Sequence, residues 1–372
     1  MNICVPTSGF RNKINCLLLI LAVGFISYCK VTKENSKTPV YIRSITIEGS
    51  HIYAISGNRL FDIDQKSGEI RQFKSEYFYQ SYSISAGPDG EKYISTDKGI
   101  YAFVDEKWIE IPGFPGHHAE DIVLNKKNNK ELWLTGYNIG YDILGHMISK
   151  PVGPIKFDGQ KFTLYDPIPP TDRKISIVFD RSGNLWYSNG KRLAKYDGEK
   201  WEIFDSSNSD LAEIEYICSL GSDILGNIWI GGCEADEIIK FNGLGTKIYQ
   251  KSKLNISPEE QRRVDHILSD NSGNIWFSFC NAWDCLIGKF DGSNRWVIYK
   301  EENFRFYIYD LAIDDDGNIW IGGGGDYFGG LIKYDGEKWT HYEISVSSGQ
   351  IDKYLYEVKP YQMKYYEINQ EN

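Results

Sequence analysis

The chain has 372 residues, a net charge of −10 at pH 7 and an aromatic content of 15%. This abundance of aromatic residues is unlike that of a disordered chain. The acidic balance argues against non-specific binding to nucleic acid, which needs basic patches. We therefore expect a folded protein with no nucleic-acid partner.

The N-terminus has the features of a secretory leader. Arg11 and Lys13 precede an apolar run at 14–26, which is shorter than a membrane span and matches a signal sequence. Cys29 follows this run as in a bacterial lipobox, although Tyr28 is larger than the usual residue at that position. We predict that residues 1–28 form a signal peptide, that Cys29 is lipidated, and that 29–40 form a polar tether. The alternatives are plain secretion and an uncleaved anchor. Either way, we expect the protein in the bacterial cell envelope, facing the periplasm or the cell surface.

A repeated motif with a tight-turn dipeptide dominates the rest of the chain. Gly-Asn-Ile/Leu-Trp occurs at 183–186, 226–229, 273–276 and 317–320. The tryptophans at 133, 186, 229, 276 and 320 are spaced 53, 43, 47 and 44 residues apart, and most are followed by a second turn signal, Asp-Gly. A period in the forties with two hairpin signals per unit predicts the blades of a β-propeller.

The last unit illustrates the strands that we expect. An inner strand at 308–314 is followed by a turn at 315–318 and by strands at 319–322, 331–334 and 339–343. Such a sheet has to stack its apolar faces on neighbours, and a ring of sheets limits exposed edges. Seven units can be counted, at 41–75, 80–112, 118–166, 173–206, 213–252, 262–301 and 305–345.

The first two units are weak, with Tyr53 and Tyr93 at the positions that tryptophan occupies later. We predict an all-β protein, a seven-bladed β-propeller of four-stranded antiparallel blades over 41–345, with six or eight blades as alternatives. The stretch 135–153 in the third unit reads as a long surface loop. The tail 346–372 contains two candidate strands, at 354–358 and 361–368, separated by Pro360.

Four cysteines, Cys218, Cys233, Cys280 and Cys285, follow the tether. They show no Cys-x-x-Cys zinc spacing, so we predict no metal site. Cys233 and Cys280 each lie four residues after a repeat tryptophan, at equivalent positions of adjacent units. In an oxidising envelope we expect a disulfide between Cys280 and either Cys233 or Cys285, with free buried thiols as the alternative.

Two further residue types recur with the repeat. An aspartate precedes the first turn glycine by three residues at 180, 223, 270 and 314. We interpret it as a cap that accepts backbone N–H bonds, because the bidentate glutamate of a calcium loop is missing. A lysine precedes the second turn at 156, 195, 240, 289 and 333, where we expect a solvated or pairing position.

The units from 173 to 345 resemble the two-component regulator propeller repeat, and residues 330–336, Gly-Leu-Ile-Lys-Tyr-Asp-Gly, are a near-ideal copy. In that family such repeats form periplasmic sensing propellers, often fused to a histidine kinase. This chain shows no kinase segment, so the resemblance implies a stand-alone envelope propeller.

Function on a propeller usually lies at one mouth of the central channel, where the loops after the second strands and before the inner strands converge. Aromatic and charged residues in these loops suit a small polar ligand, such as a glycan or a peptide. The candidate ligand-binding residues are His118, Glu120, Tyr137, Arg173, Glu215, Arg263, His266, Trp283, Asp284, Tyr307 and Tyr327.

The sequence gives little support for an enzymatic function. Streptogramin lyases are also seven-bladed, but their Glu-x-His arrangement is not found, and the nearest group is Asp265-His266. We predict a non-catalytic binding or sensing module that needs no cofactor. The alternatives are a protein-interaction scaffold in an envelope complex and a streptogramin-lyase-like enzyme.

Overall fold

The computed structural model describes most of the chain after residue 37, and the signal peptide and Cys29 lie outside the described residues. The described residues are 38–87, 89–125, 131–141, 144, 146–169, 171, 175–205, 207–209, 211, 216–233, 236–256, 260, 262–282, 284–300, 306–325, 329–347, 350–358 and 362–367.

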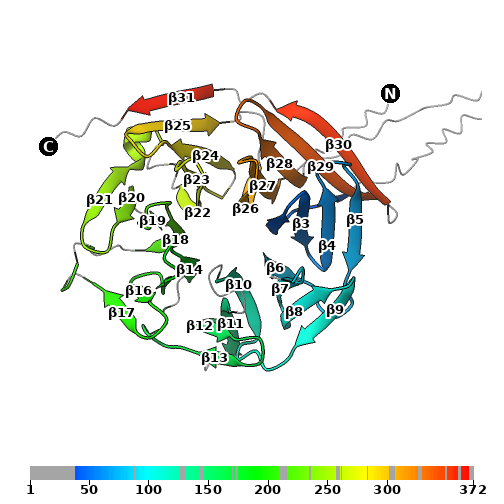
Figure 1. The fold of residues 1–372 in the computed structure, drawn as a ribbon, viewed down its shortest axis with the longest axis horizontal. Coiled ribbons are helices and arrows are strands. Elements are labelled where there is room, and N and C mark those ends of the chain that lie inside the picture. The colour runs from blue at the N-terminus through cyan, green and yellow to red at the C-terminus, as the bar shows by residue number, and fades with distance from the viewer. Residues whose placement is uncertain are drawn as a thin grey trace, which may run out of the picture.

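Seven sheets of antiparallel strands stand around a central axis, and each contains four strands that are consecutive in sequence (Figure 1). Blade 1 comprises β2 (Ser44–Glu48), β3 (His51–Ser56), β4 (Arg59–Asp64) and β5 (Ile70–Lys74). Blade 2 comprises β6 (Ser81–Ala86), β7 (Lys92–Thr96), β8 (Gly99–Val104) and β9 (Lys107–Ile111). Blade 3 comprises β10 (His118–Leu124), β11 (Leu132–Tyr141), β12 (Met147–Phe157) and β13 (Phe162–Leu164).

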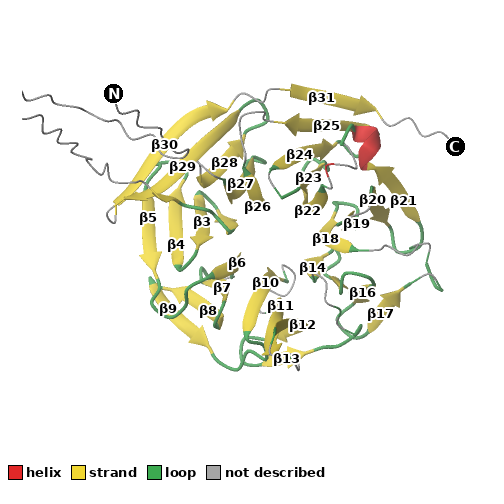
Figure 2. Ribbon diagram, turned by 180° about the vertical axis from the view of Figure 1, so that it is seen from behind, coloured by secondary structure: helices red, strands yellow, loops and turns green. Residues whose placement is uncertain are grey.

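The second half of the ring continues in the same way (Figure 2). Blade 4 comprises β14 (Ser176–Phe179), β15 (Leu185–Ser188), β16 (Leu193–Tyr196) and β17 (Trp201–Phe204). Blade 5 comprises β18 (Ile217–Ser222), β19 (Ile228–Gly232), β20 (Glu237–Phe241) and β21 (Thr246–Gln250). Blade 6 comprises β22 (Arg263–Ser269), β23 (Ile275–Cys280), β24 (Cys285–Phe290) and β25 (Arg295–Lys300). Blade 7 comprises β26 (Tyr307–Ile313), β27 (Ile319–Gly324), β28 (Gly329–Tyr334) and β29 (Trp339–Ser347).

The predicted fold class, a seven-bladed propeller of four-stranded blades, is confirmed. The turn glycines explain why the motif marks hairpins, because Gly183 and Gly317 have φ values of 84° and 82°, which other residues rarely adopt. Tyr53 faces Asp62 on the next strand, in the register that Trp320 and Lys333 share in blade 7.

The repeat motif folds into a small polar network, seen clearly in blade 7. The Asp314 carboxylate accepts the backbone N–H of Asn318 at 2.8 Å and the indole N–H of Trp320 at 2.9 Å. The Lys333 ammonium lies 5.3 Å from the centroid of the same indole. Blades 4, 5 and 6 repeat this arrangement around Asp180, Asp223 and Asp270. The interpretation of these aspartates as turn caps is confirmed.

The apolar core lies between adjacent blades. Trp320 and Leu331 of blade 7 pack in one cluster with Ile52 and Phe61 of blade 1, and all four are essentially fully buried. Burial of one large apolar side chain contributes about 1.5–3 kcal/mol to the free energy of folding. A blade alone cannot bury both faces of its sheet. Packing between neighbours therefore holds the ring together.

The sequence predicted a long surface loop at 135–153, and this prediction was wrong. In the described residues of this stretch, the β11–β12 hairpin is extended instead. The two strands stay paired out to Tyr141 and Met147, and both of these side chains are exposed. The pairing of the two strands continues past the usual blade length.

Three further strands lie along the edge of the ring. β1 (Thr38–Pro39) pairs with the end of β29, β30 (Gln350–Val358) covers the outer side of β29, and β31 (Gln362–Glu367) pairs with β25. A 3-10 turn, η1, spans Lys251–Leu254. The described part of the chain contains no helix with the length and apolarity needed to cross a bilayer.

Candidate ligand-binding site at the channel mouth

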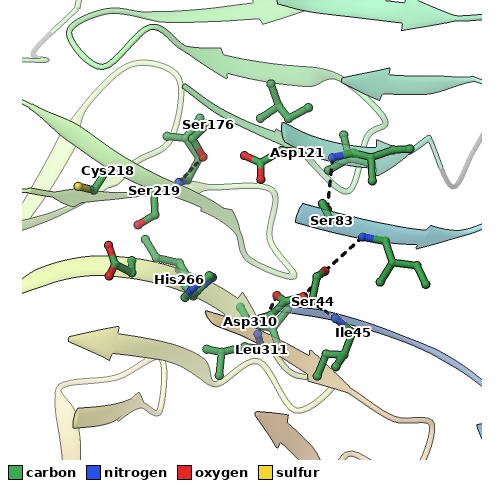
Figure 3. Close-up of a pocket in the computed structure, with 18 residues that line it drawn as sticks. Ser44, Ile45, Ser83, Asp121, Ser176, Cys218, Ser219, His266, Asp310 and Leu311 are labelled. Carbon is green, nitrogen blue, oxygen red and sulfur yellow. Dashed lines mark hydrogen bonds between the residues drawn. The ribbon is translucent and has the colours of Figure 1, made fainter. Parts of the chain in front are cut away.

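A cavity of about 270 Å³ lies on the central axis, lined by the innermost strands of all seven blades (Figure 3). One equivalent position in each strand places a polar residue directly before a buried or half-buried aliphatic one. We call these seven residues the polar ring: Ser44, Ser83, Asp121, Ser176, Ser219, His266 and Asp310.

β-bulges mark the inner strands next to the polar ring. In β26, Ile308 faces Gly323 and Asp310 faces Gly322, so Tyr309 is the extra residue. The inner strands of blades 2, 3, 5 and 6 are irregular at the same place. A bulge bends the strand and re-aims its side chains. In these five blades the bulge lies where a polar side chain enters the channel lining, whereas Ser44 and Ser176 line the cavity from strands in regular register.

Three serines of the polar ring each link their blade to the next one by a hydrogen bond. Their hydroxyl oxygens accept the backbone N–H of the aliphatic residue in the following blade, at 3.1–3.4 Å. These bonds join Ser44 to Ile84, Ser83 to Ile122, and Ser176 to Leu220. The ring thus satisfies backbone groups that would otherwise be buried without a partner.

Asp310 makes the same kind of bond where blade 7 meets blade 1. Its carboxylate accepts the Ile45 N–H at 2.9 Å, the Ser44 hydroxyl at 2.6 Å and the Leu311 N–H at 2.8 Å. The side chain retains some contact with the cavity but lies deep inside the ring. Burial therefore raises the pKa of Asp310 to about 6, with a contribution from the negative charge of Asp121, against the lowering effect of the three donors.

Aromatic and basic side chains from neighbouring blades meet at the mouth, at the start of the inner strands. The exposed Arg43 guanidinium lies 5.2 Å from the ring centroid of Tyr309 and 6.0 Å from that of Tyr82. Tyr82 in turn stacks on His118 at 6.3 Å. Residues of blades 7, 1, 2 and 3 therefore form a continuous surface.

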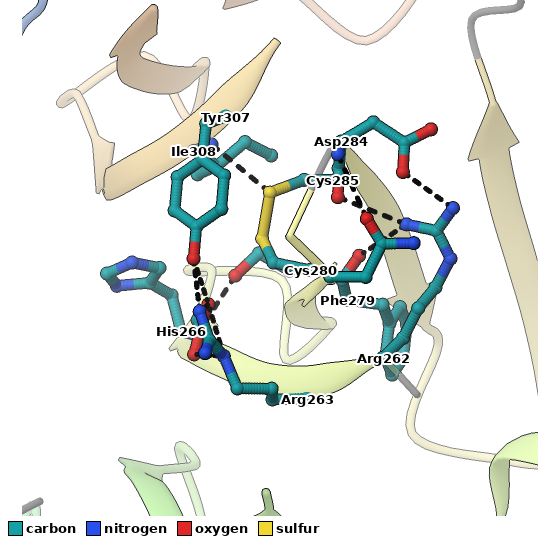
Figure 4. Close-up of a disulfide and its surroundings, with 12 residues drawn as sticks. Arg262, Arg263, His266, Phe279, Cys280, Asp284, Cys285, Tyr307 and Ile308 are labelled. Carbon is teal, nitrogen blue, oxygen red and sulfur yellow. Dashed lines mark hydrogen bonds and ion pairs between the residues drawn. A yellow bond between two sulfur atoms is a disulfide. The ribbon is translucent and has the colours of Figure 1, made fainter. Parts of the chain in front are cut away.

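The same surface continues into blade 6 (Figure 4). The Tyr307 ring lies 5.1 Å from that of Tyr309, and its hydroxyl donates to Asp265 at 3.3 Å. Arg263 pairs with Asp265 at 3.1 Å and bonds the Tyr307 hydroxyl. Burial, aided by the charge of Asp265, raises the pKa of Tyr307. We call this surface the mouth arc: His118, Tyr82, Arg43, Tyr309, Tyr307 and Arg263.

Six of the predicted site residues lie in or beside this region. His118, Arg263 and Tyr307 belong to the mouth arc, and His266 belongs to the polar ring. Tyr137 faces His118 across the β10–β11 pair, and burial together with the charges of Glu120 and Asp121 raises its pKa to about 12.

Glu120 lies in the irregular stretch of β10, between His118 and Asp121. Asp284 instead pairs with the buried guanidinium of Arg262 at 2.7 Å. Its carboxylate therefore stabilises the local loop. The predicted residues Arg173, Glu215, Trp283 and Tyr327 lie outside the described residues.

The sequence-based prediction missed Arg43, Tyr82 and Tyr309 of the mouth arc and every residue of the polar ring except His266. A usable signal was present, because each inner strand carries a polar residue just before its central aliphatic one. Comparing that position across the units would have identified the polar ring.

Two disulfides lie close to the channel. Cys280 pairs with Cys285 across β23 and β24, which is one of the two pairings left open by the sequence. Cys233 pairs with Cys218 rather than with Cys280, because the adjacent residues of β18 and β19 are in register and bring the two Cα atoms within 5.0 Å. No group of three or more His, Cys, Asp or Glu side chains that could hold a metal ion occurs among the described residues.

Comparison with solved structures shows the same fold in several proteins. The extracellular domain of the putative hybrid two component system BT3049 from B. thetaiotaomicron is 15% identical, with a TM-score of 0.58 over 82% of this chain and 40% of that one. Virginiamycin B lyase from Staphylococcus aureus is 12% identical, with a TM-score of 0.57 over 77% and 95%. A streptogramin B lyase is 14% identical, with a TM-score of 0.56 over 84% and 94%.

At these identities the likeness concerns the fold alone. No curated protein matches the chain in sequence. Residues 306–325, which include β26 and β27, match the family described as two component regulator propeller. One two-component regulator propeller repeat is therefore recognised at 306–325, within the units for which the glycine and tryptophan pattern predicted it.

Proposed function

We propose that this chain is a non-catalytic sensing module of the bacterial cell envelope that binds a small polar ligand at the channel mouth. The relation to the extracellular domain of a hybrid two component system supports export and a sensing role. In this proposal a lipid on Cys29 anchors the ring at the membrane. Mass spectrometry of the mature N-terminus tests the anchor, since an unmodified Cys29 would refute it.

The observation that carries the proposal is the mouth arc. Tyrosine faces alternate with a guanidinium and an imidazole at the entrance to a cavity that all seven blades line. Aromatic faces bind sugar rings and apolar side chains, while the charged groups fix orientation through hydrogen bonds. A glycan or a peptide fits this chemistry.

A thermal-shift screen of oligosaccharides and short peptides against the mature chain tests the proposal. A ligand at a hundred times its Kd stabilises the folded state by about 2.7 kcal/mol, which raises the melting temperature measurably. The double variant Arg43→Ala/Tyr309→Ala should lose the shift. Leu225→Ala, an exposed residue in the β18–β19 turn, is the matched control and should retain it. A hit that stabilises all three proteins equally would place the ligand elsewhere.

A second candidate, a lyase, is favoured by one observation. His266 lines the cavity beside Asp265, in a fold that two solved lyases share. An imidazole in this position is suited to general acid–base work. Activity on virginiamycin B that disappears in His266→Ala would replace the non-catalytic proposal.

A further inference from the structure

We propose that the central cavity binds its ligand through a protonated amine that pairs with the carboxylate of Asp310. The inference rests on the proposed function and adds the chemical class of the ligand. We use the word joint for the hydrogen bond from a backbone N–H of one inner strand to a polar-ring side chain of the preceding blade. The joint between blades 7 and 1 differs from three others.

The fold needs a hydrogen-bond acceptor at this position, and a neutral one suffices. Between blades 1 and 2, 2 and 3, and 4 and 5, a serine hydroxyl of the polar ring accepts the N–H of the next blade. Between blades 7 and 1, Asp310 does the same for Ile45. Accepting the Ile45 N–H therefore does not explain why residue 310 carries a negative charge.

The charge has no cationic partner within the described part of the chain. Asp310 accepts bonds from Ser44, Ile45 and Leu311, all of which are neutral. Asp265, which also lines the cavity, is by contrast paired with Arg263. A buried carboxylate without a counter-ion is destabilising, so such a group is usually kept for what it binds.

The surroundings of Asp310 suit an ammonium group. The eighteen residues that line the cavity include three aspartates and no lysine or arginine. Of the two arginines of the mouth arc, Arg263 pairs with Asp265, and Arg43 lies over the rings of Tyr82 and Tyr309. Neither forms an ion pair with Asp310 among the described contacts. An ammonium carries three donors, which the Asp310 carboxylate and ring hydroxyls such as Ser44 can accept.

The volume of the cavity and the position of Asp310 on its wall limit the size of the ligand. A volume of about 270 Å³ lies just below the range of roughly 300–1,000 Å³ that is usual for small-molecule pockets. Figure 3 shows Asp310 and Ser44 together on one wall of the cavity, with Asp121 and His266 also turned toward it. A small amine, or the amine-bearing end of a longer ligand held by the mouth arc, fills this space.

Isothermal titration calorimetry on the mature chain tests the assignment with matched pairs of probes. These are ethanolamine against ethylene glycol, and glucosamine against glucose. We expect only the amines to bind. Asp310→Ser, which copies the other joints, and Asp310→Asn should each weaken amine binding at least tenfold. Asp316→Asn, an exposed residue in the turn of the same blade, should bind as the wild type does.

Melting temperatures separate loss of binding from loss of fold. The Ser and Asn variants should melt at or above the wild-type temperature, because they remove a buried charge and keep a polar side chain at the joint. The proposal is overturned if the neutral probes bind as well as the amines, if Asp310→Ser binds amines as tightly as the wild type, or if calcium alone occupies the site in an Asp310-dependent manner. Should a screened ligand bind at the mouth arc regardless of Asp310, this inference fails and the proposed function stands. If no compound binds, both fail.

Discussion

The buried bond between the Trp320 indole and the Asp314 carboxylate should be one of the strongest single interactions in blade 7. The two atoms are 2.9 Å apart, and the residues are 1% and 4% exposed. A hydrogen bond to a charged group contributes about 1.5–3 kcal/mol net. Asp314→Asn keeps an oxygen for the Asn318 N–H but turns an amide N–H toward the indole, and Trp320→Phe removes the indole donor.

A double-mutant cycle measured by urea unfolding at pH 7 isolates this bond from the packing that Trp320→Phe also disturbs. We expect a coupling energy of about 1.5–3 kcal/mol between Asp314→Asn and Trp320→Phe. The same cycle at Asp270 and Trp276 of blade 6, where the atoms are 3.0 Å apart, should give a similar value. A coupling below about 0.5 kcal/mol at both sites would refute the claim that this hydrogen bond is among the strongest single interactions of the blade.

Two further predictions concern stability. The Cys218–Cys233 disulfide spans 15 residues, so its loss in Cys218→Ser/Cys233→Ser should cost about 3 kcal/mol by the loop-entropy argument, and a cost below about 1 kcal/mol in urea unfolding would contradict it. His341 is fully buried, and burial lowers its pKa to about 4 from 6.5. As the pH falls through 6.5, His341 is protonated in the unfolded chain but stays neutral in the folded one. Its contribution to stability is therefore full above pH 6.5 and is lost as the pH falls toward 4. We expect wild type to lose about 2 kcal/mol more than His341→Phe between pH 7 and pH 5, and equal losses would show that His341 is not the cause.

Much of the fold could be predicted because each blade is encoded locally. The turn glycines, such as Gly183 and Gly317, require positive φ, and the alternating residues beside them fix which face of each strand is buried. Even the weak first two units kept this pattern, with Tyr53 and Tyr93 in the tryptophan register. The extended β11–β12 hairpin was misjudged because nothing local to 135–153 distinguishes a long hairpin from a loop.

The candidate site was only partly predictable, because it depends on contacts that local patterns do not encode. Ser44 and Asp310 are 266 positions apart and meet only when the ring closes. Arg43 lies between Tyr82 and Tyr309 for the same reason, since its partners belong to the second and the last blade. The bulge beside Asp310 leaves no sequence signature beyond one polar residue in an apolar strand.

Repetition nonetheless supplies information that a non-repetitive chain would not. Three joints of the ring use a serine hydroxyl as acceptor, and departures from that solution indicate where something else is selected. Asp310, a charged acceptor where a hydroxyl suffices, is such a departure, as is the paired Arg263 and Asp265 next to the Cys280–Cys285 disulfide. Asp310 and Asp265 both line the central cavity, which is why we place the function there.

The central claim is that the channel mouth binds a small polar ligand. Native mass spectrometry of the mature chain with the compounds selected by thermal shift tests it most directly. We predict a one-to-one complex with the wild type that is absent from Arg43→Ala/Tyr309→Ala and is retained by Leu225→Ala. Complexes of equal intensity in all three proteins would contradict the claim.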